Sequence, residues 1–294
     1  MTNALVLSSG AQFAGYQVGV LKRLMYDLER DYQILCGTSA GALNSFILAH
    51  TPYGKPKEAW KELWYVWNNL TTDKIIKDWF PFGRLSVFWK KSLYDSNPLR
   101  NLIKEYFDYK SIKSSNKKIS IGAVSLDNGE KFFATEENEN LDEWALASAS
   151  CPIFMPSVSI NNQLWIDGGI KIVVPIAQAL KYSNVKEIDV ILCDSYYKNL
   201  NHPEKESIFY VITRCIELMF EKIAMSDIKI ATLRAENFNF LDKCEQKKIK
   251  VRIIKPSINL PNKGILKFCK DDIKKMIEIG YADAKNLEKD ILVM

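Results

Sequence analysis

The sequence predicts an α/β fold in which a mainly parallel sheet is covered by helices on both faces. The apolar run Ala4–Ser8 fits a buried parallel strand, and a loop of small residues, 9–15, follows it. Tyr16–Glu29 then repeats apolar residues at helical spacing. A second apolar run, Tyr32–Cys36, leads through a tight turn into the helix-like run Ala42–His50. This alternation of strand and helix is typical of a parallel sheet with helices on both sides.

The rest of the chain continues the alternation. Asp127-Asn128-Gly129 is a hairpin turn signal between two β-like runs. We expect strands at Lys118–Val124, Glu130–Ala134, Leu164–Ile166, Ile188–Cys193 and Val251–Ile254, and helices at Leu99–Phe107, Asn140–Ser150, Ile208–Phe238 and Asp271–Leu287. Asn97 is the expected N-cap of the first of these helices, with Pro98 at its first position. No repeat or linker interrupts the pattern, so we expect one domain over residues 1–294.

Residues 53–108 differ from the rest by their aromatic content. Trp60, Trp64 and Trp67 share one face of an expected helix, and further aromatic residues follow them. We interpret this stretch as a helical insertion or cap. Two interpretations of its aromatic residues stay open: packing of the cap onto the core, or contact with lipid. The part best suited to lipid contact is Trp79–Gly83.

Composition excludes several classes of protein. The hydrophobic fraction of 47% and the charged fraction of 26% are ordinary for a soluble globular chain. No apolar stretch approaches the roughly 20 residues of a membrane span. The first residues carry no basic region of a signal peptide, so we expect a cytoplasmic protein. The six cysteines show no metal-type spacing, and we expect them to be reduced.

The formal net charge of +5 is modest and local. Much of the basic excess lies in Lys110–Lys118 and Lys243–Lys255. Two interpretations remain for it: solvated surface, or weak peripheral attraction to anionic membranes. Because no nucleic-acid-binding motif accompanies these lysines, we expect no nucleic-acid partner. The sequence predicts no particular oligomeric state.

The turn before Ala42 has the pattern G-x-S-x-G. It reads Gly37-Thr38-Ser39-Ala40-Gly41, between a strand and a helix. A sharp turn of this kind crowds the backbone, and glycines at both flanks remove Cβ atoms that would clash. It exposes the serine hydroxyl above the sheet, at the positive end of the following helix. Ser39 is therefore the candidate nucleophile.

A serine nucleophile needs a base to accept its proton. His50 stands eleven residues further along the same expected helix, about 16 Å away, and is excluded. His202 would complete a Ser39, Asp167, His202 order like that of α/β-hydrolases, and it stays open as an alternative. Asp167 is the preferred candidate, because it ends an apolar strand and Gly168 and Gly169 let the backbone turn close to Ser39.

Acyl transfer also needs N–H donors for the developing oxyanion. The loop after the first strand supplies Gly10 and Ala11, and Ala40 follows the nucleophile directly. A phosphate-binding loop is excluded, because Tyr16-Gln17 stands where that motif needs lysine and serine or threonine. A dinucleotide site is excluded as well, since G-x-G-x-x-G is absent.

These elements together resemble the patatin-like phospholipase family. The resemblance rests on the first loop and its helix (7–21), the Gly37–Gly41 turn, the run 147–152 before Asp167-Gly168-Gly169, and the closing segment 267–282. It implies a three-layer α/β/α fold with Ser39 as nucleophile and Asp167 as base. It also implies hydrolysis of acyl esters in phospholipids or related lipids through an acyl-enzyme, with no metal or cofactor.

The first loop departs from the family pattern, which is close to Gly-Gly-Gly-x-Arg/Lys-Gly. Here the positions read Ser9, Gly10, Ala11, Gln12, Phe13 and Ala14, so one glycine remains and Phe13 replaces the basic residue. The asparagine that usually follows the Asp-Gly-Gly motif is replaced within Val173-Val174-Pro175. A left-handed φ at Ala11 or Ala14 would cost about 1 kcal/mol or more. The alternative function is therefore a weakly active or non-catalytic module that binds lipid or protein.

Overall fold

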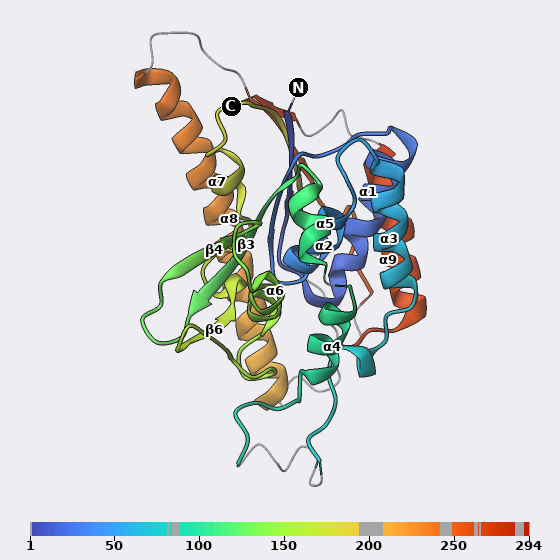
Figure 1. Cartoon of the computed structure of the whole chain (residues 1–294), viewed down its shortest axis with the longest axis vertical. Helices are drawn as coiled ribbons and strands as arrows, with labels where there is room; N and C mark the ends of the chain where they lie inside the picture. Colours follow the sequence, from blue (N-terminus) through green and yellow to red (C-terminus); the bar gives the residue numbers. More distant parts are fainter. Residues whose placement is uncertain are drawn as a thin grey trace.

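A mostly parallel sheet runs through the middle of the computed structural model (Figure 1). The structure describes residues 2–80, 83, 89–106, 108–193, 208–241, 249–261, 264, 266–285 and 291–293. Its strands are β1 (Thr2–Leu7), β2 (Ile34–Thr38), β3 (Lys118–Ser125), β4 (Lys131–Thr135), β5 (Val158–Ile160), β6 (Gln163–Asp167), β7 (Val185–Ile191), β8 (Lys250–Ile254) and β9 (Ile291–Val293). Their order in the sheet is β5-β6-β3-β2-β1-β7-β8-β9, with β4 paired to β3. The five strands from β3 to β8 in this order are parallel, and the outer strands are antiparallel.

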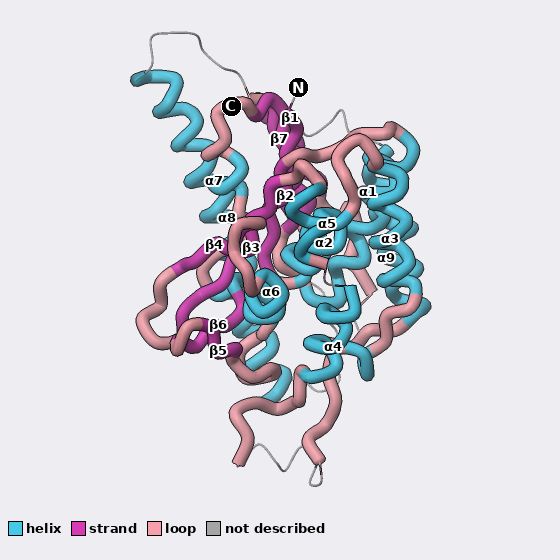
Figure 2. The backbone as a smooth tube through the Cα atoms, viewed as in Figure 1, coloured by secondary structure: helices cyan, strands magenta, loops and turns pink. Residues whose placement is uncertain are grey.

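Helices cover both faces of the sheet (Figure 2). They are α1 (Gly15–Leu21), α2 (Ala40–His50), α3 (Pro56–Asn68), α4 (Asn97–Tyr106), α5 (Tyr109–Ser114), α6 (Leu141–Ala149), α7 (Ile176–Ala179), α8 (Ile208–Leu241) and α9 (Lys270–Asp283). Short turns of helix add η1 (Ala11–Ala14), η2 (Lys22–Asp27), η3 (Thr72–Lys74) and η5 (Gly168–Ile170). Among the described residues, none of the helices combines the length and apolar character that a membrane crossing demands.

Strand β1 shows how the layers are held together. Leu5 and Leu7 point into the larger hydrophobic cluster, which the helices α1, α2, α3 and α9 cover. Ala4 and Val6 point into a second cluster, which lies under α7 and α8. Both faces of the strand are buried, which explains why its sequence is apolar throughout. The expected α/β architecture is confirmed.

Two local expectations were wrong. The helix predicted over Tyr16–Glu29 does not continue as one regular helix, because α1 passes into the wider π-type turns of η2 at Lys22. Asn97 is the first helical residue instead of the cap. The carboxylate of Asp95 does the capping, since it accepts the Asn97 N–H at 2.9 Å.

The aromatic residues of 53–108 fall into a buried group and an exposed group. Trp60 and Trp67 are buried in the core under α3, and Trp64 on the same helix is 39% exposed. Trp60 and Trp67 therefore pack the cap onto the body of the protein. Phe80 and Trp89, by contrast, are 90% and 75% exposed. Phe82 and Phe88 lie outside the described residues.

Candidate active site

Ser39 sits at the turn between β2 and α2. Its φ of 56° is a left-handed value that non-glycine residues rarely adopt. The turn is tight because α2 starts directly against β1: a Cβ on Gly41 would lie 2.3 Å from the Leu7 carbonyl oxygen. A Cβ on Gly37 would meet Gly41 in the same way. The two glycines of the motif therefore stand where close backbone approach requires them.

The sheet register brings Asp167 to Ser39. Strand β3 extends beyond the end of β2, since Thr38 pairs with Gly122 and β3 continues to Ser125. Strand β6 pairs with this extension and places Asp167 opposite Ala123. It runs antiparallel to β3, so Asp167 does not lie at the end of a parallel strand. The carboxylate reaches Ser39 because the antiparallel strand returns toward the end of β2.

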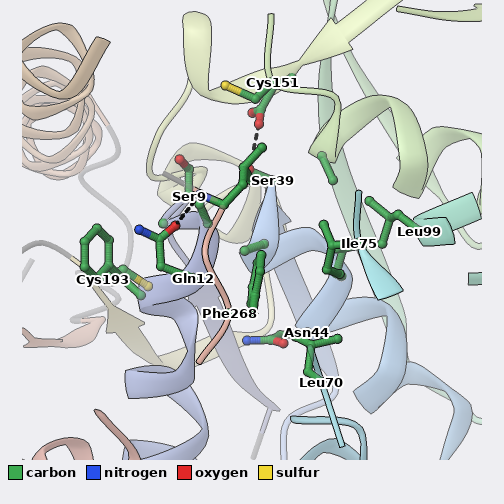
Figure 3. Close-up of a pocket in the computed structure, with 18 of the residues that line it drawn as sticks. Ser9, Gln12, Ser39, Asn44, Leu70, Ile75, Leu99, Cys151, Cys193 and Phe268 are labelled. Atoms are coloured by element: carbon green, nitrogen blue, oxygen red, sulfur yellow. Dashed lines mark hydrogen bonds between the residues drawn. The ribbon is translucent and has the colours of Figure 1, made fainter. Parts of the chain in front are cut away.

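Ser39 and Asp167 are in direct contact. Ser39 Oγ donates to Asp167 Oδ2 at 2.6 Å, and the dashed line from Ser39 in Figure 3 marks this bond. The other carboxylate oxygen accepts the Gly169 N–H at 2.7 Å, which fixes the orientation of the side chain. Both Ser39 and Asp167 are buried. This distance lies within the range of direct proton transfer.

Burial raises the pKa of the Asp167 carboxyl to about 7, while hydrogen bonds from Ser39 and the Gly169 N–H oppose the rise. A base with this pKa is well matched to work near neutral pH. Cys151 lies beside the pair, and burial together with the charge of Asp167 raises the pKa of its thiol. Cys151 therefore remains protonated and does not compete as a nucleophile.

Ser148 of α6 supports the turn from behind, and the sequence interpretation missed it. Its Oγ accepts the Ser39 N–H at 3.0 Å and donates to the Gly122 carbonyl at 2.6 Å. One hydroxyl thus ties α6, β3 and the nucleophile turn together. Its only sequence signal is a run of small residues before Asp167, Ala147-Ser148-Ala149-Ser150, which does not single out one serine.

The loop after β1 lies beside Ser39 and holds the candidate oxyanion donors. Gly10 is sterically required, because a Cβ there would lie 2.3 Å from Cys193 Cβ. Ala11 has a φ of 43°, whereas Ala14 is ordinary right-handed helix at −68°. The strain expected from the loss of glycine therefore falls on Ala11. Gly10, Ala11 and Ala40 all line the same cavity as Ser39.

Two glutamine side chains hold this loop in place. Gln17 donates to the Ser8 carbonyl at 3.0 Å, and Gln12 accepts the Leu266 N–H at 3.1 Å. Asn44 donates to Gln17 at 2.8 Å and accepts the Trp67 indole N–H at 2.8 Å. These hydrogen bonds fix the backbone of the loop through side chains. The loop therefore keeps a defined shape although most of the family's glycines are missing.

A cavity of about 450 Å³ opens in front of Ser39. Figure 3 shows Ser39 and Ser9 on one side of it, with Leu70, Ile75 and Leu99 at a distance from them. Most of its lining is aliphatic or aromatic, as expected for a site that accepts an apolar chain. The described residues contain no cluster of three or more histidine, cysteine or acidic side chains able to hold a metal ion.

The two histidines take different positions relative to the site. His50 contacts the Phe46 carbonyl through Nδ1 at 2.8 Å and accepts the Asp108 N–H through Nε2 at 3.1 Å. Both ring nitrogens serve the structure, which agrees with its exclusion as a base. His202 lies outside the described residues, so the alternative that uses it stays a hypothesis.

Comparison with known proteins decides the family. The sequence matches the family described as patatin-like phospholipase over residues 5–180. The chain belongs to this family. The resemblance stated from the motifs is thereby confirmed, and patatin-like phospholipases are lipid acyl hydrolases as a group. The matched range contains Gly10, Ser39 and Asp167.

Two further comparisons place this patatin-like chain among individual proteins. It is 25% identical to a cGAMP-activated phospholipase of Pseudomonas aeruginosa over 182 residues, which are 57% of this chain and 52% of the relative. The chain thus aligns with about half the length of that curated relative. It also resembles the crystal structure of VipD from Legionella pneumophila at 9% identity, over all of this chain and 68% of that one, with a TM-score of 0.43.

Proposed function

We propose that this protein is a serine acyl hydrolase that cleaves acyl esters of phospholipids or related lipids. Ser39 is the nucleophile and Asp167 the general base. The observation that carries the proposal is the 2.6 Å hydrogen bond between the Ser39 hydroxyl and a buried carboxylate whose pKa is raised to about 7. Family membership supports the lipid as substrate.

The reaction follows from this geometry. Ser39 Oγ attacks the ester carbonyl carbon while its proton passes to Asp167 Oδ2. The N–H groups of Gly10, Ala11 and Ala40 stabilise the resulting oxyanion. The C–O bond to the alcohol then breaks, and Asp167 returns the proton to the leaving alcohol. Water then attacks the acyl-enzyme while Asp167 takes its proton, and Asp167 passes that proton to Ser39 Oγ as the bond to the acyl group breaks and the fatty acid leaves.

We propose in addition that the protein meets its substrate at a membrane surface. The exposed aromatic residues Phe80 and Trp89 support this contact, because such side chains partition into the interfacial region of bilayers. Trp89 is followed by Lys90 and Lys91, which add attraction to anionic lipid. The cavity is lined by the neighbouring helix α4, so a bilayer contact here would present acyl chains to it.

The proposal is tested by hydrolysis of a phospholipid and of a p-nitrophenyl acyl ester. Wild-type protein should release fatty acid from both, and Ser39→Ala and Asp167→Asn should each lose at least about a thousandfold of kcat. His202→Ala should keep wild-type activity. Full turnover in Ser39→Ala would reject the function, and loss of turnover in His202→Ala would favour the serine-histidine-aspartate alternative.

One observation favours the second candidate, a weakly active lipid-binding or protein-binding module. Ala11 holds a left-handed φ at a donor position, and losing one oxyanion donor typically costs about a hundredfold to a thousandfold in rate. The same assay decides between the two, since a module would bind lipid without turnover. Because the relative from P. aeruginosa is named for activation by cGAMP, the assay is run with and without cGAMP. A cGAMP-dependent rate would indicate an enzyme that needs an activator.

A further inference from the structure

Helix α8 is fixed beside the dyad by two contacts. The ring of Phe220 packs against Gly169, where an added Cβ would lie 3.0 Å from it. Further along the helix, Asp227 Oδ2 accepts the N–H groups of Val173 and Val174 at 2.8 and 2.9 Å. This is the segment in which the family's asparagine is missing. The two contacts fix the position of α8 relative to Asp167.

The same helix carries a pair of charges to the cavity. Arg214 and Glu217 line it, with Arg214 six residues before Phe220 and thus about 9 Å further along the helix axis. Of the cavity-lining residues that the structure describes, Arg214 is the one cation. The loop position where the family resemblance places a basic residue holds Phe13 instead. The positive charge of the site therefore comes from a different element.

We propose that Arg214 binds the phosphate of a phospholipid whose acyl ester lies at Ser39. This inference rests on the proposed function and names its substrate class. An arginine guanidinium suits the role, because it can donate two parallel hydrogen bonds to phosphate oxygens. The aliphatic part of the cavity takes the acyl chain, and Arg214 takes the headgroup.

The present partner of Arg214 does not prevent this. Its guanidinium donates to Glu217 at 3.0 Å, and the two side chains are 35% and 25% exposed. Partly exposed pairs one turn apart on a helix contribute little, so a phosphate can replace the carboxylate. Glu217 then loses its ion pair with Arg214 and remains on the surface of α8.

The surroundings of Arg214 agree with a headgroup site at a lipid surface. At helical spacing it lies between the buried side of α8, which holds Phe220, and the side that exposes Val211 and Leu218. Those two residues are 46% and 47% exposed. A guanidinium between a cavity and an exposed apolar strip has the position of a side chain that reaches the headgroup layer.

The test compares two lipids that share their acyl chains, dihexanoylphosphatidylcholine and dihexanoylglycerol. In Arg214→Gln, the ratio of kcat/KM for phospholipid over glyceride should fall between about 10-fold and 100-fold, and Arg214→Lys should recover part of it. Glu217→Gln removes the same ion pair but keeps the cation, so its ratio should equal or exceed that of the wild type. Lys222→Gln removes an exposed charge from the same helix and should retain the wild-type ratio.

The proposal would be overturned by an unchanged ratio in Arg214→Gln or by an equal fall of the ratio in Glu217→Gln. The first would mean that the cation does not read the phosphate. The second would mean that the ion pair acts by holding the helix. The proposal would also be overturned if the ratio fell as much in Lys222→Gln as in Arg214→Gln. The effect would then come from surface charge in general.

A binding measurement separates this inference from the proposed function. In a Ser39→Ala background, calorimetry with dihexanoylphosphatidylcholine should show weaker binding when Arg214→Gln is added, while dihexanoylglycerol binds both proteins equally. This readout holds even where no lipid is hydrolysed, in which case the proposed function alone fails. Glycerophosphocholine has the headgroup without acyl chains and should bind weakly. Binding as tight as that of the lipid would assign the site to a soluble phosphate compound instead.

Discussion

The buried carboxyl of Asp167 should affect both the activity and the stability of the protein, with opposite dependence on pH. Its carboxyl is buried, and its pKa is raised to about 7. The base must be ionised to accept the Ser39 proton, so kcat/KM should rise with pH and level off above an apparent pKa near 7. A pH profile measured with a p-nitrophenyl ester checks this. A profile that is flat from pH 5 to 9 would contradict the assignment of the base.

The free energy of unfolding should fall with rising pH, whereas kcat/KM should rise. Between the unfolded pKa of 3.8 and the folded value of about 7, the folded state binds a proton that the unfolded state releases. The free energy of unfolding therefore falls as pH rises through this window. Asp167→Asn is neutral throughout and should be more stable than wild type at pH 8 by about 1 to 4 kcal/mol, with a smaller difference at pH 5. Urea unfolding at the two pH values measures it, and a pH-independent difference would be inconsistent with the burial argument.

Adding a methyl group at Gly10 should lower stability and activity, whereas removing one at the neighbouring Ala11 should not. Gly10→Ala should reduce both stability and kcat, because its Cβ would overlap Cys193. Ala11→Gly relieves the left-handed φ of 43° and should change stability by between 0 and about +1 kcal/mol, with kcat equal to or above wild type. Thermal unfolding and ester hydrolysis of the two variants test this, and a loss of activity in Ala11→Gly would show that the loop depends on its alanine.

Residue by residue, the sequence singled out the two candidate catalytic residues but not the residues that support them. Ser39 and Asp167 stand in motifs whose residue types the chemistry itself requires, and the structure brings them into contact. The sequence also predicted that Ala11 is strained if its φ is left-handed, because alanine stands there where the family pattern has glycine. Ser148 was not visible, since one hydroxyl in a run of small residues gains its role only from the fold.

Helix α6 is the element that supports the nucleophile turn. Ser148→Ala would leave the buried Ser39 N–H without its acceptor and the Gly122 carbonyl without this donor, at a cost of about 1 to 3 kcal/mol. We expect kcat to fall while KM stays within about twofold, because the displaced group is the nucleophile. Ser150→Ala is the matched control: it removes a hydroxyl bonded to Leu146 of the same helix. Equal effects on kcat in both variants would reduce the role of Ser148 to general support of the helix.

Strand β6 marks the limit of prediction at the level of elements. Its existence was readable from Leu164–Ile166, but its direction was not, because an antiparallel return at the edge of the parallel strands depends on pairing with the free end of β3. The π-type turns of η2 were not predicted either, and the cap was assigned to Asn97 instead of Asp95 because both residue types cap helices. Local patterns identified this strand, and a tertiary contact determined how it pairs.

For the whole molecule, the exposed aromatic residues predict where it meets lipid. Phe80→Ser combined with Trp89→Ser should weaken flotation with anionic vesicles by about tenfold or more. The control is Tyr65→Ser on α3, which removes an aromatic side chain that is 58% exposed elsewhere on the surface. Unchanged vesicle binding in the double variant would show that these two residues do not dock the protein.

The arrangement of the cavity could not be read from the sequence. Its walls combine η1, α2, α4, α8 and the segment before α9, which lie far apart along the chain. We propose that residues 53–108 fold with the sheet as one domain, since α3 packs on α1 and α2 and α4 packs on α6. A single calorimetric transition is expected. The order of strand-like and helix-like runs correctly indicated an α/β chain, while the placement of Arg214 beside the cavity emerged only from the fold.

The central claim is that Asp167 makes Ser39 a nucleophile, and reaction with a fluorophosphonate tests it most directly. Intact wild-type protein should gain one phosphonyl adduct, and peptide mapping should place it on Ser39. Asp167→Asn should react at least about a hundredfold more slowly, because the hydroxyl loses the base that accepts its proton. Labelling of a different residue, or equal labelling rates in wild type and Asp167→Asn, would contradict the account.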